Sequence, residues 1–359
     1  MGWNNPPVRW SELERILSGR PPEVGDGGDS PAWTRKRDRY LPTGGTANPG
    51  PTDAADGDGR VPYAELHCHS NFSFLDGASH PEELVEAAAL LGLDAIALTD
   101  HDGLYGVVRF AEAARELGVR TVFGAELSLG LTEPQAGNPD PEGEHLLLLA
   151  DGQDGYHRLS RVLTTAHLDG GEKGKPAYDL PYVVEQTRDH CVVLTGCRKG
   201  AVRQALAQHG PQAAFEQLKH LVTAYGRDRV FVELTDHGLP DDSTRNDLLA
   251  GMAADLGLPI VATNAVHYAH PQRGHLAAAV AAVRARRSLD DLAGWLPPAP
   301  TAHLRTGEEM AARFARHPGA VQRAAVLGVQ LSFDLRLLAP SSRRSTSRPA
   351  TPRRPTSPS

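Results

Sequence analysis

Apolar and polar positions change their pattern at Val61, where short apolar runs begin to alternate with amphipathic segments. Compact runs rich in Val, Ile and Leu predict buried strands, and apolar residues that recur every three or four positions predict helices. The predicted strands are Tyr63–Leu66, Ala95–Leu98, Thr121–Leu127, His145–Leu149, Val192–Leu194, Val230–Leu234 and Ile260–Ala262. The predicted helices between them are Pro81–Leu91, Gly106–Leu117, Gly155–His167, Leu180–Asp189, Ala201–Tyr225 and Asp242–Leu256. Because parallel strands need helical cover, this alternation favours a parallel α/β sheet or barrel.

The segments before and after this region differ from it in sequence composition and in predicted secondary structure. Gly and Pro crowd residues 19–59, so we expect a flexible leader over 1–60, with one short helix at Trp10–Leu17 that a Ser-x-x-Glu capping box predicts. After the last strand, further helices are predicted at His270–Arg287, Ser288–Leu296 and Thr306–Phe314. The expected organisation is a leader over 1–60, a barrel domain over 61–269, a helical extension over 270–340 and a tail over 341–359.

The tail is unlike the rest of the chain. Ser341–Ser359 holds six Ser, five Arg, four Pro and three Thr, with Ala350 as its one apolar residue, and is predicted to be disordered. It is open to three interpretations: a basic segment that touches nucleic acid, a plain solvated tail, or a stretch read out of frame. We favour the last, because Arg outnumbers Lys 32 to 5 and out-of-frame reading of GC-rich coding tends to produce these residue types.

Composition and charge exclude several classes of protein. With 37 basic and 44 acidic residues the net charge is −7, which argues against a general electrostatic surface for nucleic acid or an anionic membrane. If the protein binds a polyanion, we therefore expect it to do so through a local group of residues or through a metal ion. No apolar run approaches the roughly 18 residues of a membrane span, and no signal peptide is evident. Three cysteines cannot build a disulfide framework in 359 residues, so we expect a cytoplasmic protein with no membrane partner.

Potential metal ligands stand at the ends of the predicted strands. His67 and His69 follow the first strand, and because side chains alternate along a strand, both imidazoles point to the same side. The others are Asp100 and His101 after the second strand, Glu126 in the third, Cys197 after the fifth and His267 after the seventh. In a parallel barrel these carboxyl ends meet at one rim, so the side chains are expected to converge. Such nitrogen, oxygen and sulfur donors favour zinc or manganese over magnesium.

Two further potential ligands are each open to two interpretations. Cys197 is either a thiolate ligand or a small buried hydrophobe, and His145 is ambiguous because it begins a strand instead of ending one. Cys68 and Cys191 lie inside apolar runs and are expected in the core. The remaining histidines are expected at the surface or in structural roles.

Five short motifs of the barrel region occur in a recognisable order: Tyr63–Ser70, Asp76-Gly77, Ala97–His101, Gly124–Glu126 and Ala262–Tyr268. Together they resemble the polymerase-and-histidinol-phosphatase (PHP) domain. Three further motifs are Met1–Pro7, Asp102–Gly106 and Arg284–Leu289. With them, residues 1 to about 340 are similar to the amino-terminal part of the bacterial C-family DNA polymerases, and within them to the error-prone, damage-inducible branch.

The resemblance implies a distorted seven-stranded (β/α) barrel with an α-helical extension and up to three divalent metal ions at its rim. By this similarity, the first ion is held by His67, His69 and Glu126, the second by Glu126, His145 and Cys197, and the third by Asp76, His101 and His267. In the family a further Asp stands two residues before the last His. Here that position is Ala265, which is expected to weaken the first site.

The same resemblance implies a role in translesion DNA synthesis after DNA damage. DNA would be bound through the parent polymerase, with other replication or mutagenesis-complex proteins as possible partners. The carboxylates for nucleotidyl transfer would follow Pro340, so the expected function is that of the PHP portion alone. One alternative is a stand-alone metal-dependent phosphoesterase or 3′–5′ exonuclease. Another is a non-catalytic, metal-stabilised scaffold of a mutagenesis complex.

Overall fold

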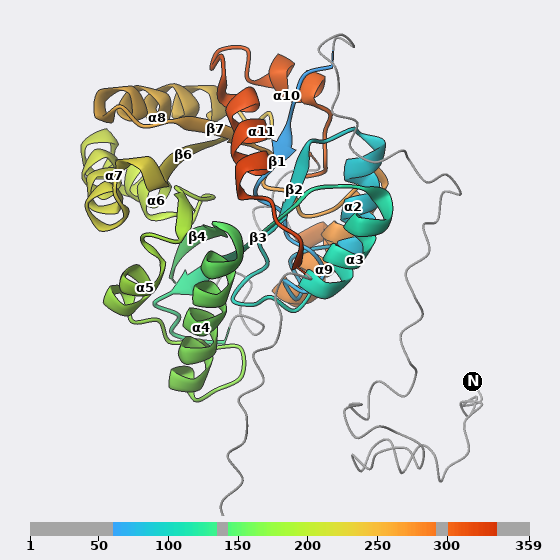
Figure 1. Cartoon of the computed structure of the whole chain (residues 1–359), viewed down its shortest axis with the longest axis horizontal. Helices are drawn as coiled ribbons and strands as arrows, with labels where there is room; N and C mark the ends of the chain where they lie inside the picture. The colour runs from blue at the N-terminus through green and yellow to red at the C-terminus, as the bar shows by residue number, and fades with distance from the viewer. Residues whose placement is uncertain (1–59, 135–142, 292–300, 336–359) are drawn as a thin grey trace, which may run out of the picture. The chain divides into compact units, whose positions relative to one another are not determined.

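The computed structural model of the chain describes residues 60–134, 143–291 and 301–335 (Figure 1). The predicted leader helix at Trp10–Leu17 and the tail 341–359 lie outside these residues. Of the predicted helix Ser288–Leu296, only the start is described, and it contains the 3-10 helix η3 (Leu289–Asp291). Among the residues described, no helix has both the length and the apolar character needed to cross a bilayer.

Within the described ranges, seven strands form a single sheet whose spatial order follows the chain order. They are β1 (Ala64–Glu65), β2 (Ala95–Leu98), β3 (Thr121–Leu129), β4 (Glu144–Ala150), β5 (Cys191–Leu194), β6 (Val230–Thr235) and β7 (Ile260–Thr263). Just beyond β1 and β7 the sheet almost closes: the His69 amide donates to the Val266 carbonyl at 2.8 Å, and the Val266 amide donates to His67 at 2.8 Å. The predicted α/β barrel of seven strands is therefore confirmed.

The expectation that all strands are parallel was wrong for β4. This strand pairs antiparallel with both β3 and β5, whereas the other neighbouring pairs are parallel. A parallel neighbour needs a crossover, usually a helix, and the described residues between β3 and β4, 130–134 and 143, form none. As a result, the amino end of β4 lies at the same rim as the carboxyl ends of the other strands, with His145 opposite Ser128.

Helices cover the outside of the sheet, as the amphipathic segments predict. They are α2 (Pro81–Leu90), α3 (Val107–Leu117), α4 (Gly152–Gly170), α5 (Leu180–Thr187), α6 (Ala201–His209), α7 (Pro211–Tyr225) and α8 (Asp242–Leu256), with the 3-10 helix η1 (Arg227–Arg229) before β6. The single helix predicted at Ala201–Tyr225 was wrong. Gly210 adopts φ +83 there, which residues other than glycine rarely do, and Pro211 begins the next helix.

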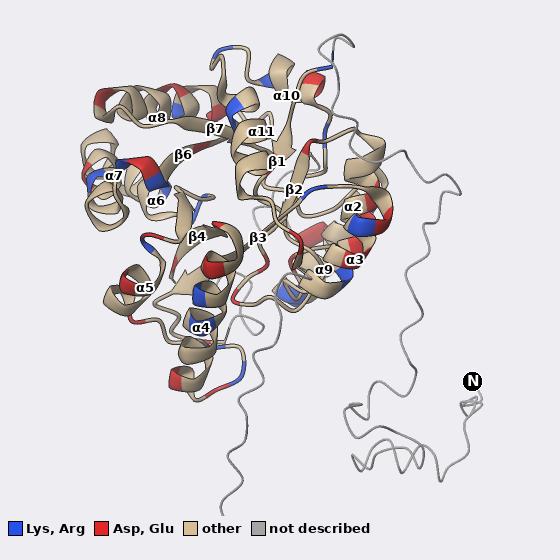
Figure 2. Cartoon of the chain, viewed as in Figure 1, with Lys and Arg blue, Asp and Glu red and all other residues tan. Residues whose placement is uncertain are grey.

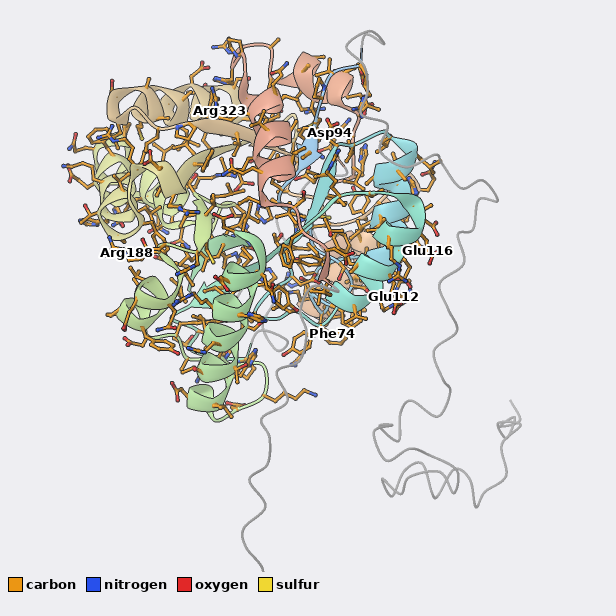
Figure 3. All side chains as sticks on the ribbon, viewed as in Figure 1. Phe74, Asp94, Glu112, Glu116, Arg188 and Arg323 are labelled. Carbon is orange, nitrogen blue, oxygen red and sulfur yellow. The ribbon has the colours of Figure 1, made fainter. Side chains whose placement is uncertain are left out.

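The extension after β7 contains η2 (Pro271–Arg273), α9 (Gly274–Ala285), α10 (Gly307–Arg313) and α11 (Ala320–Leu331). The last of these was not predicted. It packs against β1, β2, β3 and β7 and so covers the region where the barrel almost closes (Figure 1). Gly328 permits the close approach, because a Cβ at this position would lie 2.6 Å from the Cβ of Ala64. Arg323, labelled in Figure 3, donates to the Ile260 carbonyl at 2.9 Å.

Candidate metal centre

All eight predicted ligands lie at the rim formed by the carboxyl ends of the parallel strands and the amino end of β4. His67, His69 and Glu126 are almost fully buried. The full set is His67 and His69 after β1, Asp76 in the β1–α2 loop, His101 after β2, Glu126 in β3, His145 in β4, Cys197 after β5 and His267 after β7. The topology therefore brings together residues that are far apart in sequence, from His67 to His267.

Glu126 lies at the middle of this cluster. Its Oε2 is 3.2 Å from His69 Nε2, 3.2 Å from His145 Nδ1 and 3.5 Å from His101 Nε2. Its Oε1 is 3.7 Å from His67 Nε2. In the part of the chain that the structure describes, neither carboxylate oxygen has a hydrogen-bond partner, although both are buried, and the same is true of the Nε2 atoms of His67 and His69. Buried polar atoms without partners are uncommon, and four of them facing one point fit a bound cation.

Asp76 forms a second focus next to the first. Its Oδ2 lies 2.8 Å from His69 Nδ1, 3.2 Å from His267 Nε2 and 3.8 Å from His101 Nε2. Among the described residues, potential ligand atoms within 4.8 Å of one another form three groups: His67, His69 and Glu126; His69, Asp76 and His101; and His101, Glu126 and His145. The first group has the composition expected for the first ion, whereas His69 and His101 are each shared between neighbouring groups.

Cys197 lies at the edge of the cluster, with Sγ 3.4 Å from His145 Nδ1. It is close enough to act with His145, as the resemblance implies, although it is in none of the three groups. Burial, followed by the charge of Glu126, raises the pKa of the Cys197 thiol well above its usual range. The thiol is thus neutral here, and a bound cation is what would favour the thiolate.

The comparisons with known proteins bear on this site. Residues 65–237 match the PHP domain family. Over this segment the chain is therefore similar to PHP domains. Over 345 residues it is 57% identical to the error-prone DNA polymerase of Mycobacterium bovis, which corresponds to 95% of this chain and 31% of that protein. It is 51% identical over 389 residues to the error-prone DNA polymerase of Nocardia farcinica, covering 95% of this chain and 33% of that protein.

These matches confirm the resemblance that the motifs indicated. The chain spans about a third of the length of the curated relatives it matches. Among solved structures, an amidohydrolase from Chromobacterium violaceum has 18% identity and a TM-score of 0.41, over 57% of this chain and 88% of that chain. The PHP match ends at residue 237, so β7, His267 and the extension lie beyond it.

The environment of the barrel rim favours a charged Glu126 and a neutral His101. Burial alone would raise the pKa of Glu126, but the charges of His145 and His67 lower it well below its usual range. Burial, aided by the neighbouring His69, lowers the pKa of His101 well below its usual value. At neutral pH the rim therefore presents a carboxylate and a neutral imidazole, the protonation states in which these side chains bind metals.

His69 behaves differently from His101. Burial opposes its protonation, but the hydrogen bond to Asp76 and the charges of Glu126 and Asp76 prevail and raise the pKa of His69 to about 9. At neutral pH the His69 ring is therefore protonated, and its positive charge lies between the two carboxylates. A metal ion that binds His69 would displace this proton.

Glu233 is a site residue that the sequence analysis missed. Its Oε1 accepts a hydrogen bond from His67 Nδ1 at 2.8 Å, which leaves Nε2 of the same ring facing Glu126. A carboxylate on the outer nitrogen of a metal-binding histidine fixes the orientation of the ring and raises its basicity. The signal was present in the sequence, because Glu233 is an acid inside the apolar run Val230–Leu234. Thr263 holds the same carboxylate oxygen from β7.

Backbone strain also concentrates around the cluster. Leu75 precedes Asp76 with φ +59, Asp102 follows His101 with φ +51, and Ala265 has φ +41 two residues before His267. Positive φ is uncommon for residues other than glycine and tends to occur at functional sites. The strain observed here accordingly supports a functional rather than a purely structural role for the rim.

Proposed function

We propose that this chain is the PHP-domain portion of an error-prone DNA polymerase that acts in damage-induced translesion synthesis. The similarity to such polymerases over 95% of the chain supports this assignment. We assign nucleotidyl transfer to the remaining two thirds or so of the relatives' length, and we expect DNA to be bound through the parent polymerase. Acidic and basic residues are interspersed on the outer helices of the described region (Figure 2), which fits a domain that does not bind DNA through overall charge.

We further propose that the rim binds divalent transition metal ions, zinc or manganese, at up to three sites. The observation that supports this most strongly is the set of buried, unpartnered oxygen and nitrogen atoms of Glu126, His67 and His69. A pair of such ions would supply an activated water and positive charge for a phosphoryl group. The proposed ligands are His67, His69, Asp76, His101, Glu126, His145, Cys197 and His267.

Elemental analysis tests the metal centre directly. We expect protein produced with zinc and manganese in the medium to retain at least one transition metal ion per chain. Removal of the metal with EDTA should lower the melting temperature, because an ion that binds only the folded state stabilises it by mass action. The proposal would be contradicted if the protein carried no stoichiometric metal and if EDTA left its melting temperature unchanged.

A second candidate function is hydrolysis of phosphodiesters, as a phosphoesterase or a 3′–5′ exonuclease. The cluster of acids and imidazoles favours it, whereas Ala265 counts against it because the related domains are expected to have a carboxylate at this position. Residue 265 adopts φ +41, a conformation that Asp and Asn tolerate better than most residues. The missing ligand can therefore be introduced without new backbone strain.

We expect Ala265→Asp to increase hydrolysis of a single-stranded DNA 3′ end by about tenfold or more, since even an outer-shell partner of a metal ligand typically changes affinity or activity by about 10–100-fold. Ala265→Asn is the matched control, because it fits the same backbone conformation without adding charge, and it should leave turnover low. Brisk hydrolysis by the unaltered protein, abolished by His67→Ala, would show instead that the rim is already a competent phosphoesterase. Unaltered turnover in all variants would favour the scaffold interpretation.

A further inference from the structure

Arg284 reaches the metal centre from outside the PHP match. It lies in the last turn of α9, and its Nη1 donates to Asp76 Oδ1 at 3.1 Å. Both side chains are largely buried, with 15% of Arg284 and 9% of Asp76 exposed. An ion pair that is removed from water in this way has a stronger influence on geometry than a surface pair.

The two oxygens of Asp76 have separate environments. Oδ1 faces the guanidinium, whereas Oδ2 faces His69 and His267, at 2.8 and 3.2 Å. The guanidinium thus donates its hydrogen bond to the Asp76 oxygen that points away from the histidines. Oδ2 also lies 3.8 Å from His101 Nε2, so this oxygen faces the two histidines of the ligand group His69, Asp76 and His101.

The backbone at Asp76 is fixed, but its carboxylate needs a further restraint. A turn holds the main chain, with the Asp76 amide donating to the Ser73 carbonyl at 2.9 Å and Leu75 at φ +59. The final torsion of an aspartate side chain has a broad preference, so a fixed backbone does not by itself decide how the two oxygens are presented. A hydrogen bond to one oxygen does decide it.

We propose that Arg284 is a positioning residue that makes Asp76 a ligand through one oxygen. This inference rests on the proposed metal centre and adds to it that α9, part of the helical extension, completes the centre. By holding Oδ1, the guanidinium prevents chelation by both oxygens and leaves a coordination position open. The metal affinity of the Asp76 side of the rim then depends on where α9 lies.

The test compares Arg284→Gln, Arg284→Lys and Arg286→Gln in the full chain. Zinc or manganese is titrated into metal-free protein, and the melting temperature is measured in EDTA and with metal. We expect Arg284→Gln to weaken binding at one site by about 10–100-fold, as loss of a group that orients a ligand typically does. Arg284→Lys should weaken metal binding less than Arg284→Gln does, because lysine retains the positive charge although it lacks the planar fork of donors. Arg286 is exposed, so Arg286→Gln is the matched control and should bind like the unaltered protein.

A purely structural role for Arg284 gives a different result. In that case Arg284→Gln lowers the melting temperature in EDTA, but the increase on adding metal stays the same as in Arg286→Gln, and the inference is overturned. If Arg284 acts through Asp76, the double variant with Asp76→Asn should bind no more weakly than Asp76→Asn alone. Additive losses would also contradict the inference. Absence of metal binding by the unaltered protein would instead refute the proposed metal centre itself.

Discussion

Replacing Glu126 with Gln is expected to weaken metal binding at the barrel rim by about 100-fold or more, beyond the effect typical of an outer-shell partner. The two Glu126 oxygens lie 3.2–3.7 Å from nitrogens of four histidines, and the residue belongs to two of the three ligand groups. Gln has nearly the same shape but lacks the negative charge, so the loss reports on the carboxylate rather than on packing. Elemental analysis and metal titration of the purified variant measure it.

The control for this substitution is Glu185→Gln in α5, which makes the same chemical change at an exposed position. It should retain the metal content of the unaltered protein. Retention of metal by Glu126→Gln at unchanged affinity would mean that the cluster is a buried network of acids and histidines without a metal-binding role. The proton that His69 holds would then be part of the native structure.

The same substitution, Gly to Ala, is expected to have opposite effects in two helices. In α8, a Cβ at Gly251 meets nothing within 4 Å, so Gly251→Ala should stabilise the protein by about 0.5–1 kcal/mol through helix propensity. In α11, a Cβ at Gly328 would lie 2.6 Å from that of Ala64 and 3.2 Å from that of Ala95. Gly328→Ala should therefore destabilise the protein by about 1–3 kcal/mol, the usual range for overpacking.

Urea denaturation of both variants measures these effects, provided that the slope against denaturant is unchanged. Gly251→Ala also serves as the control, because it shows how much the helix gains from alanine when no contact opposes it. A Gly328→Ala variant as stable as Gly251→Ala would mean that α11 does not pack closely on β1 and β2. It would then contradict the position of α11 over the closure of the barrel.

Much of the barrel could be predicted because its signals are local. The strand β2 and the helix α3 were predicted nearly residue by residue, since a buried apolar run and an amphipathic repeat depend only on neighbours in sequence. The helix α11 was missed, although its buried positions Val321, Ala324 and Gly328 recur at helical spacing. Its packing against four strands, rather than its propensity, accounts for its stability as a helix.

By itself, the sequence determined which residue types end each strand, and hence that His67, His69, His101 and Glu126 are candidates for one site. The tertiary structure determined which other residues lie next to these candidates. The antiparallel course of β4 brings His145 to the rim, and contacts across 166 and 208 positions of sequence add Glu233 to His67 and Arg284 to Asp76. No local pattern encodes such contacts, because each depends on how distant segments pack once the barrel has formed.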